Sequence, residues 1–483
     1  MSSELQGPGG SSLPPHVLVF PFPAQGHMIP LLDLAHLLSL HGLAVTVLVT
    51  PKNVPLLDPL LSRAPTIRTL VLPFPSHPSL PAGTENARGL PHHYFLSLKG
   101  ALGGLREPIL RWASSNPTPP DVIVSDFFLG WTKGVAADLG IPRLVFSPSC
   151  ALTLSVMNCL WREMPKRGDP DDDAYPIAFP TVPGSLVFPW HHLSTIYRSY
   201  REGDPAWEFI KQGFLDNIAS WGYVFNTFAD LETPYLGHLR SDLGHPRVWA
   251  VGPLLPPGGA DAAVDRGGAG SEGAASGVLG WLDACPEEGK VVYVCFGSQA
   301  LLSQPQAEAV AAALERSGVR FVWGAGAAEV PEGFEERTAE RGVVLRGWAP
   351  QVAILGHPAV GWFLTHCGWN SVLEGLAAGV ALLAWPMTAD QFMDARLLVD
   401  DIGVAIRACE GAGTVPDPAE LGKMIAVAVG GQRPERSKAL ELRETTAAAV
   451  RVGGSSHRDL EELVGALWGL KRQEGCPPSS SRG

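Results

Sequence analysis

WAPQVAILGHPAVGWFLTHCGWNSVLEGLAAGVALLAWPMTADQ, which runs from Trp348 to Gln391, carries the strongest indication of the fold of this chain. Ala359 to Thr365 is a short apolar run typical of a buried strand. The turn His366-Cys367-Gly368 separates this strand from a helix that we expect to begin near Trp369. Strands that alternate with helices in this way form parallel sheets with helices on both faces, so the stretch predicts a doubly wound α/β domain.

Polar side chains gather at the start of the expected helix. Gly368 allows the backbone to approach a ligand closely, while Asn370 and Ser371 place hydrogen-bond donors in the first helical turn. Free N–H groups and the positive end of the helix dipole already favour an anion there. Glu374 shares the helix face of Asn370 and Ser371 and can accept hydrogen bonds from the vicinal hydroxyls of a ribose. We therefore expect a nucleotide diphosphate at this turn.

The two ends of the stretch carry groups suited to a base and a sugar. Trp348 and Gln351 follow an expected strand at residues 343–345 and offer an aromatic platform and an amide. Asp390 and Gln391 place a carboxylate beside a carboxamide, which suits hexose hydroxyls. The alternative interpretation is a buried α/β unit whose Trp, His and Gly residues only pack and turn. The clustering of polar groups after the carboxyl end of a strand favours a ligand site.

The whole stretch resembles, in length and residues, the signature box of the plant secondary-product glycosyltransferases that use UDP-sugars. This resemblance implies the two-domain fold called GT-B. It implies that Trp348 stacks on uracil and that Gln351 and Glu374 bind the ribose. Ala381 departs from the Pro that is usual in the family, and we expect this change to affect the entry to a strand rather than donor contacts.

The resemblance also assigns the rest of the donor. It implies that the diphosphate is held by His366, Asn370 and Ser371, and that the hexose is bound by Asp390 and Gln391. A final Gln in this box generally goes with UDP-glucose, whereas His there goes with galactose or rhamnose. We therefore expect UDP-glucose as co-substrate and no other cofactor.

The rest of the chain repeats the alternation of strands and helices, and its length of 483 residues with 46% hydrophobic residues fits two domains. We expect strands at residues 16–22, 44–49, 67–72, 122–125, 143–146, 222–226, 291–295, 320–323, 343–345, 360–364 and 381–385. The expected units are an acceptor-binding domain at 14–251, a flexible linker at 252–276 with a disordered centre, a donor-binding domain at 277–455, and a last helix at 456–472. The resemblance implies that this last helix packs back on the first domain.

Charge and cysteine usage narrow the class of protein. A net charge of −12 without a basic run argues against nucleic acid as a partner. Seven scattered cysteines without a Cys-x-x-Cys pair indicate a reducing compartment, and the polar amino end does not resemble a secretory signal. No apolar run reaches the roughly 18 residues of a membrane span. We expect a cytoplasmic protein, monomeric, that takes small-molecule substrates.

A catalytic base is expected in the first domain, because a hydroxyl nucleophile must lose its proton. His27 ends the segment PFPAQGH after the first strand, just before an expected helix, and Asp126 follows the strand that contains VIVS. Both positions lie at carboxyl ends of strands, so the carboxylate can orient the imidazole. A lone His or Asp at such positions is more often a capping or turn residue. The resemblance implies base and partner for these two residues.

We expect no metal in catalysis. The start of the helix at Asn370, with Ser298 in the loop CFGSQ, can carry the charge of a leaving diphosphate. The rival feature is Asp169 to Asp173, DPDDD, which is more typical of a solvated acidic turn. The adjacent pairs His92-His93 and His191-His192 lack the i, i+4 spacing of a helical zinc site, so we do not expect them to bind zinc.

The sequence therefore predicts an inverting glucosyltransferase that acts on a hydroxyl or carboxyl of a small lipophilic acceptor, such as a flavonoid or another phenolic. Two alternatives remain: the same fold with another UDP-hexose, and a catalytically idle UDP-sugar-binding protein. The acceptor itself is not encoded in a readable pattern, because the segments expected to shape its pocket, about 75–94 and 164–207, are Pro-rich loops.

Overall fold

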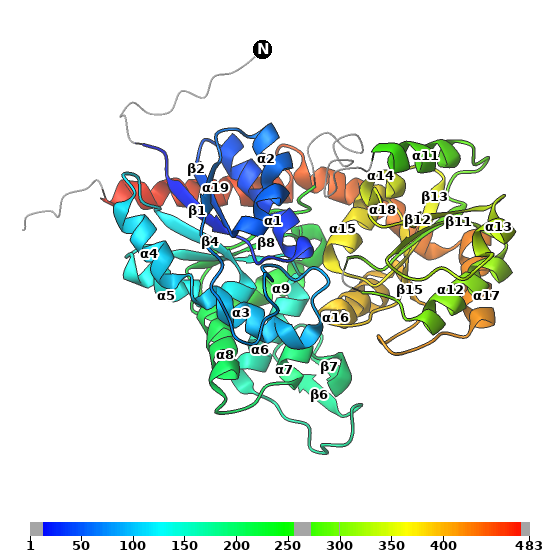
Figure 1. Cartoon of the computed structure of the whole chain (residues 1–483), viewed down its shortest axis with the longest axis horizontal. Coiled ribbons are helices and arrows are strands. Elements are labelled where there is room, and N and C mark those ends of the chain that lie inside the picture. The colour runs from blue at the N-terminus through cyan, green and yellow to red at the C-terminus, as the bar shows by residue number, and fades with distance from the viewer. Residues whose placement is uncertain (1–12, 256–271, 299, 475–483) are drawn as a thin grey trace, which may run out of the picture.

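The computed structural model describes residues 13–255, 272–298 and 300–474, which form two α/β lobes side by side (Figure 1). The first lobe surrounds a seven-stranded parallel sheet of order β3-β2-β1-β4-β5-β8-β9. Its strands are β1 (His16–Phe20), β2 (Ala44–Val49), β3 (Arg68–Val71), β4 (Val122–Asp126), β5 (Arg143–Ser147), β8 (Gly222–Phe225) and β9 (Val248–Ala250).

Helices cover both faces of this sheet because successive strand residues point to opposite sides. Val17 and Val19 of β1 pack on one face, whereas Leu18 and Phe20 pack on the other. The helices of this lobe are α1 (Gln25–Leu40), α2 (Asp58–Arg63), α3 (Phe95–Gly103), α4 (Arg106–Ser115), α5 (Thr132–Asp138), α6 (Ala151–Glu163), α7 (Thr195–Arg198), α8 (Pro205–Ile218) and α9 (Ala229–Asp242). Short 3-10 turns are η1 (Pro51–Leu57), η2 (His92–Tyr94), η3 (Phe127–Leu129) and η4 (Trp190–His192).

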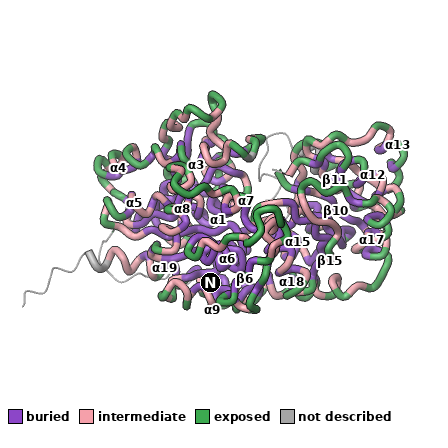
Figure 2. The backbone as a smooth tube through the Cα atoms, turned by 90° about the horizontal axis from the view of Figure 1, so that it is seen from below, coloured by how far each residue is buried: buried purple, intermediate pink, exposed green. Residues whose placement is uncertain are grey.

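The second lobe has a six-stranded parallel sheet of order β12-β11-β10-β13-β14-β15. Its strands are β10 (Val291–Cys295), β11 (Arg320–Gly326), β12 (Gly342–Arg346), β13 (Val360–Thr365), β14 (Ala381–Ala384) and β15 (Ala405–Arg407). Its helices are α11 (Glu272–Asp283), α12 (Gln304–Ser317), α13 (Phe334–Thr338), α14 (Gln351–Leu355), α15 (Trp369–Ala378), α16 (Gln391–Arg396), the π-helical turn η5 (Leu397–Ile402), α17 (Pro418–Gly430) and α18 (Pro434–Val450). Figure 2 shows that the buried backbone runs through both lobes beneath exposed outer segments.

The last helix, α19 (Ser455–Glu474), returns to the first lobe. Leu460, Leu463, Val464 and Leu467 are buried in one apolar cluster with Trp249 of β9 and its neighbours. Each such buried aliphatic side chain stabilises the packing by roughly 1.5–3 kcal/mol. The helix therefore ties the two lobes together through its covalent connection to α18, and it crosses behind the first lobe in Figure 1.

The predicted fold is confirmed, and every expected strand is present with ends that differ by at most three residues. The first strand stops at Phe20 rather than residue 22, because Pro21 has no N–H for the sheet. The helix after it begins at Gln25, so His27 lies in the first turn of α1 and not before it. Ser303 and Gln306 form a capping box at the start of α12.

Other expectations were wrong. The segment 164–207 was expected to be irregular, yet it contains an antiparallel hairpin of β6 (Pro176–Phe179) and β7 (Leu186–Pro189) as well as α7. Alternate residues of these short strands are buried, which is the pattern of a half-exposed hairpin. The short strands β9 and β15 were not predicted, because three residues carry too little pattern.

The expected linker at 252–276 is shorter than predicted at both ends. Leu254 is buried, with its N–H donating to Asn226 Oδ1 over 2.8 Å, and α11 begins at Glu272. The expected disordered centre lies outside the described residues. Among the helices of the described chain, none combines the length and apolar character that crossing a bilayer requires.

A buried polar cluster lies where α16 meets the first lobe. Asp394 is fully buried, and its Oδ1 accepts hydrogen bonds from Cys150 Sγ (3.1 Å) and Thr153 Oγ1 (3.3 Å) at the start of α6. Its Oδ2 has no hydrogen-bond partner among the described residues. Burial, followed by the charge of Asp390, raises the pKa of Asp394 well above its usual range. The two lobes therefore meet over a carboxyl group that favours its neutral form.

We predict that Asp394→Asn changes how stability depends on pH. A carboxyl whose pKa is raised in the folded state contributes stability that is present below its unfolded pKa and lost as pH rises through its folded pKa. Wild type should therefore lose stability relative to Asp394→Asn between about pH 5 and pH 8, in urea unfolding midpoints measured at both pH values. The exposed Asp171→Asn serves as the control and should follow wild type; identical pH profiles for Asp394→Asn and wild type would contradict the assignment.

Candidate active site

The site lies where the strand order of each sheet reverses. In the first sheet this switch point falls between β1 and β4, and in the second between β10 and β13. In open α/β sheets ligands bind outside the carboxyl ends of the strands at such points. His27 follows β1 and Asp126 ends β4, while Ser298 follows β10 and His366 follows β13. The sequence thus placed polar groups at both switch points.

The pair expected in the first lobe is formed. His27 Nδ1 lies 2.7 Å from Asp126 Oδ2, and the Asp126 side chain is fully buried whereas 19% of the His27 side chain is exposed. A carboxylate oxygen accepts, so Nδ1 carries the proton and Nε2 holds the lone pair. The ring stacks on Phe128 (centroids 5.0 Å apart) and meets the edge of Phe22. The imidazole is held in one orientation with its basic nitrogen available.

Asp126 is itself held by its surroundings. Its Oδ1 accepts a hydrogen bond from the N–H of Phe128 over 2.8 Å, as in a capped turn. Its backbone carbonyl accepts from the buried guanidinium of Arg143, which also donates to Asn217 Oδ1 and Ser220 Oγ. These hydrogen bonds offset the cost of burying both charged groups.

Lys99 of α3 is a buried cation close to this pair that sequence analysis missed. Its Nζ lies 3.4 Å from the centre of the Phe128 ring and has no hydrogen-bond partner among the described residues. Burial lowers the pKa of Lys99 to about 7, and the charge of Asp126 opposes that shift. The signal was a single Lys on the apolar face of FLSLKGALG, and it is ambiguous because long side chains often reach solvent from such positions.

In the second lobe, three of the predicted donor residues are linked. Gln351 begins α14, and its Nε2 donates to Ser371 Oγ (2.9 Å) and to Glu374 Oε2 (2.7 Å) on α15. Its Oε1 accepts from Tyr293 OH over 3.4 Å. Trp348 lies half-buried in the segment between β12 and α14. A carboxylate, an amide and an indole therefore share one edge of the sheet.

His366 stands in a narrow space between two glycines. A Cβ on Gly297 would lie 2.7 Å from His366 Cε1, and one on Gly368 would lie 2.5 Å from His366 Nε2. Gly297 also has a φ of +74°, which disfavours any side chain. Burial lowers the pKa of His366 to about 4, so the ring is neutral near pH 7. Ser298 follows Gly297 in the same turn and is exposed.

Asp390 and Gln391 lie at the start of α16. Asp390 Oδ2 accepts from Ser149 Oγ of the first lobe over 2.5 Å. Burial raises the pKa of Asp390, and the hydrogen bond from Ser149 and the charge of His27 oppose that shift. Gln391 is buried, and its Oε1 accepts from the N–H groups of Met387 (2.9 Å) and Thr388 (3.0 Å). The amide therefore presents only its N–H groups as possible sugar ligands.

The two halves of the site touch. Asn370 Nδ2 donates to the carbonyl oxygen of Gly26 over 2.7 Å, one residue before His27, and Trp369 Nε1 donates to the carbonyl of Asn226 over 2.7 Å. A small pocket beside this contact is lined by Ile29, Pro30, Leu254, Leu255, Leu373 and Glu374 together with the two asparagines. The sequence did not single out Asn226 or Ser149, although each follows the carboxyl end of a strand of the first sheet.

DPDDD at Asp169 to Asp173 forms the exposed turn that was predicted. Asp169 Oδ1 accepts from the N–H of Asp171, and Asp172 Oδ1 accepts from the N–H of Ala174. Asp173 pairs with Arg167 at 2.7 Å.

Comparison with known proteins identifies the family. A family model described as UDP-glucoronosyl and UDP-glucosyl transferase matches residues 276–415. Flavonol 3-O-glucosyltransferase UGT89B1 of Arabidopsis thaliana is 52% identical over 460 residues, which cover 93% of this chain and 95% of that protein. UDP-glycosyltransferase 89B2 of Stevia rebaudiana is 51% identical over 464 residues, which cover 94% of this chain and 97% of that protein.

A solved structure is similar over nearly the whole chain. The crystal structure of Arabidopsis thaliana UGT89C1 complexed with UDP-L-rhamnose has a TM-score of 0.78 and 41% sequence identity, with 95% of this chain and 100% of that chain covered. The identity and the coverage of these relatives show that this chain belongs to the plant UDP-dependent glycosyltransferases of secondary metabolism.

Proposed function

We propose that this enzyme transfers glucose from UDP-glucose to a hydroxyl of a small phenolic acceptor, with inversion at the anomeric carbon. The observation that carries the proposal is the contact between Asn370 Nδ2 and the Gly26 carbonyl, which brings the start of α15 beside His27. Glycosyl transfer requires a base for the acceptor hydroxyl and a binding site for the leaving diphosphate, and the two must lie close together.

His27 is proposed as the base. Its Nε2 takes the proton of the acceptor hydroxyl while the oxygen forms a bond to the anomeric carbon and the bond to the UDP oxygen breaks. Asp126 keeps Nδ1 protonated and stabilises the imidazolium that results, through the 2.7 Å hydrogen bond. Attack opposite the leaving group converts an α-linked donor into a β-glucoside.

The leaving diphosphate is proposed to bind at the start of α15. Asn370 and Ser371 lie in the first helical turn, where the N–H groups and the helix dipole favour negative charge. His366 is neutral there and can donate one hydrogen bond without adding a fixed charge. Ser298, in the turn after β10, is the last of the proposed phosphate ligands. With these ligands on the diphosphate, the proposed reaction requires no metal. Trp348 supports the base, and Gln351 and Glu374 bind the ribose.

Glucose as the transferred sugar is proposed from Gln391 and from the relatives. The amide N–H groups of Gln391 and the carboxylate of Asp390 provide donors and an acceptor for adjacent hexose hydroxyls. UGT89B1 is named a flavonol 3-O-glucosyltransferase, which favours glucose and a flavonol acceptor. The rival is rhamnose, because flavonol 7-O-rhamnosyltransferase of Arabidopsis thaliana is 41% identical to this chain.

Replacing the proposed base should abolish most turnover. His27→Ala should lower the rate of flavonol glucosylation by about 10²-fold or more, the usual contribution of a positioned base, with an unchanged dissociation constant for UDP. The matched control is His41→Ala at the other end of the same helix, which should glucosylate as wild type does. Near-normal turnover by His27→Ala would remove the assignment, and a loss of UDP binding would show that the side chain acts in the donor site instead.

Crowding His366 should weaken nucleotide binding. Gly297→Ala forces the imidazole to move and should raise the dissociation constant for UDP by roughly 10-fold, measured by calorimetry. Gly403→Ala is the control, because Gly403 has the same φ of +74° but nothing lies near its added Cβ. Both variants should lose about 1–2 kcal/mol of stability from backbone strain. Equal UDP affinities in the two variants would contradict the placement of the diphosphate beside His366.

Donor choice should depend on the Gln391 amide. Gln391→Glu keeps oxygens that can accept from Met387 and Thr388 but removes the N–H donors, so kcat/KM for UDP-glucose should fall about 10-fold or more. Competition between UDP-glucose, UDP-galactose and UDP-L-rhamnose, read by product mass, should show wild type preferring UDP-glucose. A wild-type preference for UDP-L-rhamnose would replace the proposed donor.

A further inference from the structure

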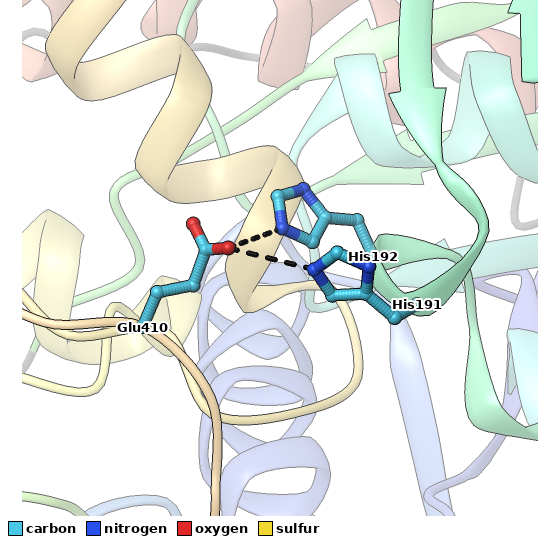
Figure 3. A group of neighbouring side chains, drawn as sticks. All are labelled: His191, His192 and Glu410. Atoms are coloured by element: carbon cyan, nitrogen blue, oxygen red, sulfur yellow. Dashed lines mark hydrogen bonds and ion pairs between the residues drawn. The ribbon is translucent and has the colours of Figure 1, made fainter. Parts of the chain in front are cut away.

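His191, His192 and Glu410 converge from the two lobes outside the proposed active site. The histidines belong to the turn η4 after β7, and Glu410 follows β15 at 218 positions from His192. Glu410 Oε1 lies 2.6 Å from His192 Nε2 and 3.6 Å from His191 Nε2, and one potential ligand atom from each residue lies within 4.8 Å of the others. Figure 3 shows the same carboxylate oxygen facing both rings.

The hydrogen bond on the far side of His191 determines which nitrogen can bind a cation. His191 Nδ1 lies 2.9 Å from the backbone carbonyl oxygen of Asp173. A carbonyl oxygen only accepts, so Nδ1 carries a proton and Nε2 is the ring nitrogen that faces Glu410. His191 Nε2 and Glu410 Oε1 lie 3.6 Å apart, too far for a direct hydrogen bond and at a separation that one bound cation can bridge. Metal-binding histidines typically have their other ring N–H held by a carbonyl or carboxylate in this way.

The other two ligands are also oriented. His192 stacks on Phe392 of α16 with ring centroids 4.4 Å apart and planes 15° apart. Arg407 lies 4.0 Å from the second carboxylate oxygen of Glu410, so Oε1 remains the oxygen directed at the histidines. The positive charge of Arg407 lowers the affinity for a cation, so binding should be micromolar rather than tighter.

We propose that His191, His192 and Glu410 form a binding site for one divalent transition-metal cation, best fitted by Zn²⁺, that links the two lobes. With metal–ligand bonds of about 2.0–2.1 Å, tetrahedral ligands stand roughly 3.4 Å apart, close to the His191–Glu410 separation. Binding requires the His192 tautomer that carries its proton on Nδ1, so that Nε2 is free for the metal, and the 2.6 Å distance between His192 and Glu410 widens. Two imidazoles with one carboxylate favour Zn²⁺, Co²⁺ or Ni²⁺ over Mg²⁺ and Ca²⁺, which prefer all-oxygen ligands.

The adjacent histidine pair gave no such prediction from sequence. In a helix, two neighbouring residues cannot place both rings on one face, so the spacing argued against a metal site. Here the pair lies in a short turn, with ring centroids 4.4 Å apart, and the third ligand comes from the other lobe. Because the ligands belong to both lobes, binding must stabilise their present arrangement.

The test is a metal titration of the full, tag-free chain after EDTA treatment and removal of the chelator. Co²⁺ binding is followed by visible absorbance near pH 7.5, and Zn²⁺ binding by calorimetry. We expect one equivalent with a micromolar dissociation constant, and a rise of a few degrees in the thermal midpoint at saturating Zn²⁺. Glu410→Gln and His191→Gln should each weaken binding at least 10-fold and remove the thermal shift, with circular dichroism confirming that both variants fold.

Glu461→Gln is the matched control. Glu461 Oε1 also faces two imidazoles, at 3.0 Å from His41 Nε2 and 4.0 Å from His457 Nε2. In the described chain, however, these three residues do not bring their ligand atoms together as His191, His192 and Glu410 do. This variant should bind Zn²⁺ as wild type does. The proposal is overturned if Glu410→Gln binds Zn²⁺ as tightly as wild type, if Glu461→Gln weakens binding equally, or if Mg²⁺ binds as tightly as Zn²⁺.

Discussion

Asn370 donates a hydrogen bond from Nδ2 to the carbonyl oxygen of Gly26, and this contact sets the start of α15 against the loop that carries His27. Trp369 Nε1 makes a parallel contact with the carbonyl of Asn226. Both bonds join backbone carbonyls to side chains of one helical turn, so the turn cannot shift without breaking two hydrogen bonds. The arrangement of His27, the proposed base, and the proposed anion site therefore depends on which face of α15 meets the first lobe.

The two buried carboxyl groups of Asp126 and Asp394 have different hydrogen-bonding surroundings. Asp126 has no exposed surface, and both of its carboxyl oxygens have a partner, His27 on Oδ2 and the N–H of Phe128 on Oδ1. Asp394 has donors on one oxygen only, and burial, followed by the charge of Asp390, raises its pKa. Hydrogen-bond donors rather than depth of burial distinguish the carboxylate proposed to orient the base from the carboxyl that packs between the lobes.

Much of this could be predicted from sequence because the informative signals are local. A buried strand, a glycine turn and a helix start are encoded within a few residues, so the fold of both sheets and the positions of His366, Asn370 and Glu374 relative to β13 follow from the pattern. The pairing of His27 with Asp126 was also expected, since parallel strands end at one edge.

The missing parts are those that depend on residues far apart in the chain. Lys99, Ser149 and Asn226 carry no pattern of their own. Lys99 gains its contact only when α3 packs beside η3 in the first lobe, and Ser149 and Asn226 gain theirs only when the lobes meet. The segment 164–207 was wrongly predicted to be irregular, because its prolines masked the alternating pattern of the hairpin β6–β7. His191 and His192 lie in the turn that follows this hairpin.

A crystal structure of this chain with UDP and a flavonol would locate both substrates. We expect uracil on Trp348, the diphosphate at the start of α15 beside His366, and a flavonol hydroxyl within hydrogen-bond distance of His27 Nε2. Nucleotide bound anywhere away from the stretch between Trp348 and Gln391, or a flavonol whose hydroxyls all lie far from His27, would contradict this expectation.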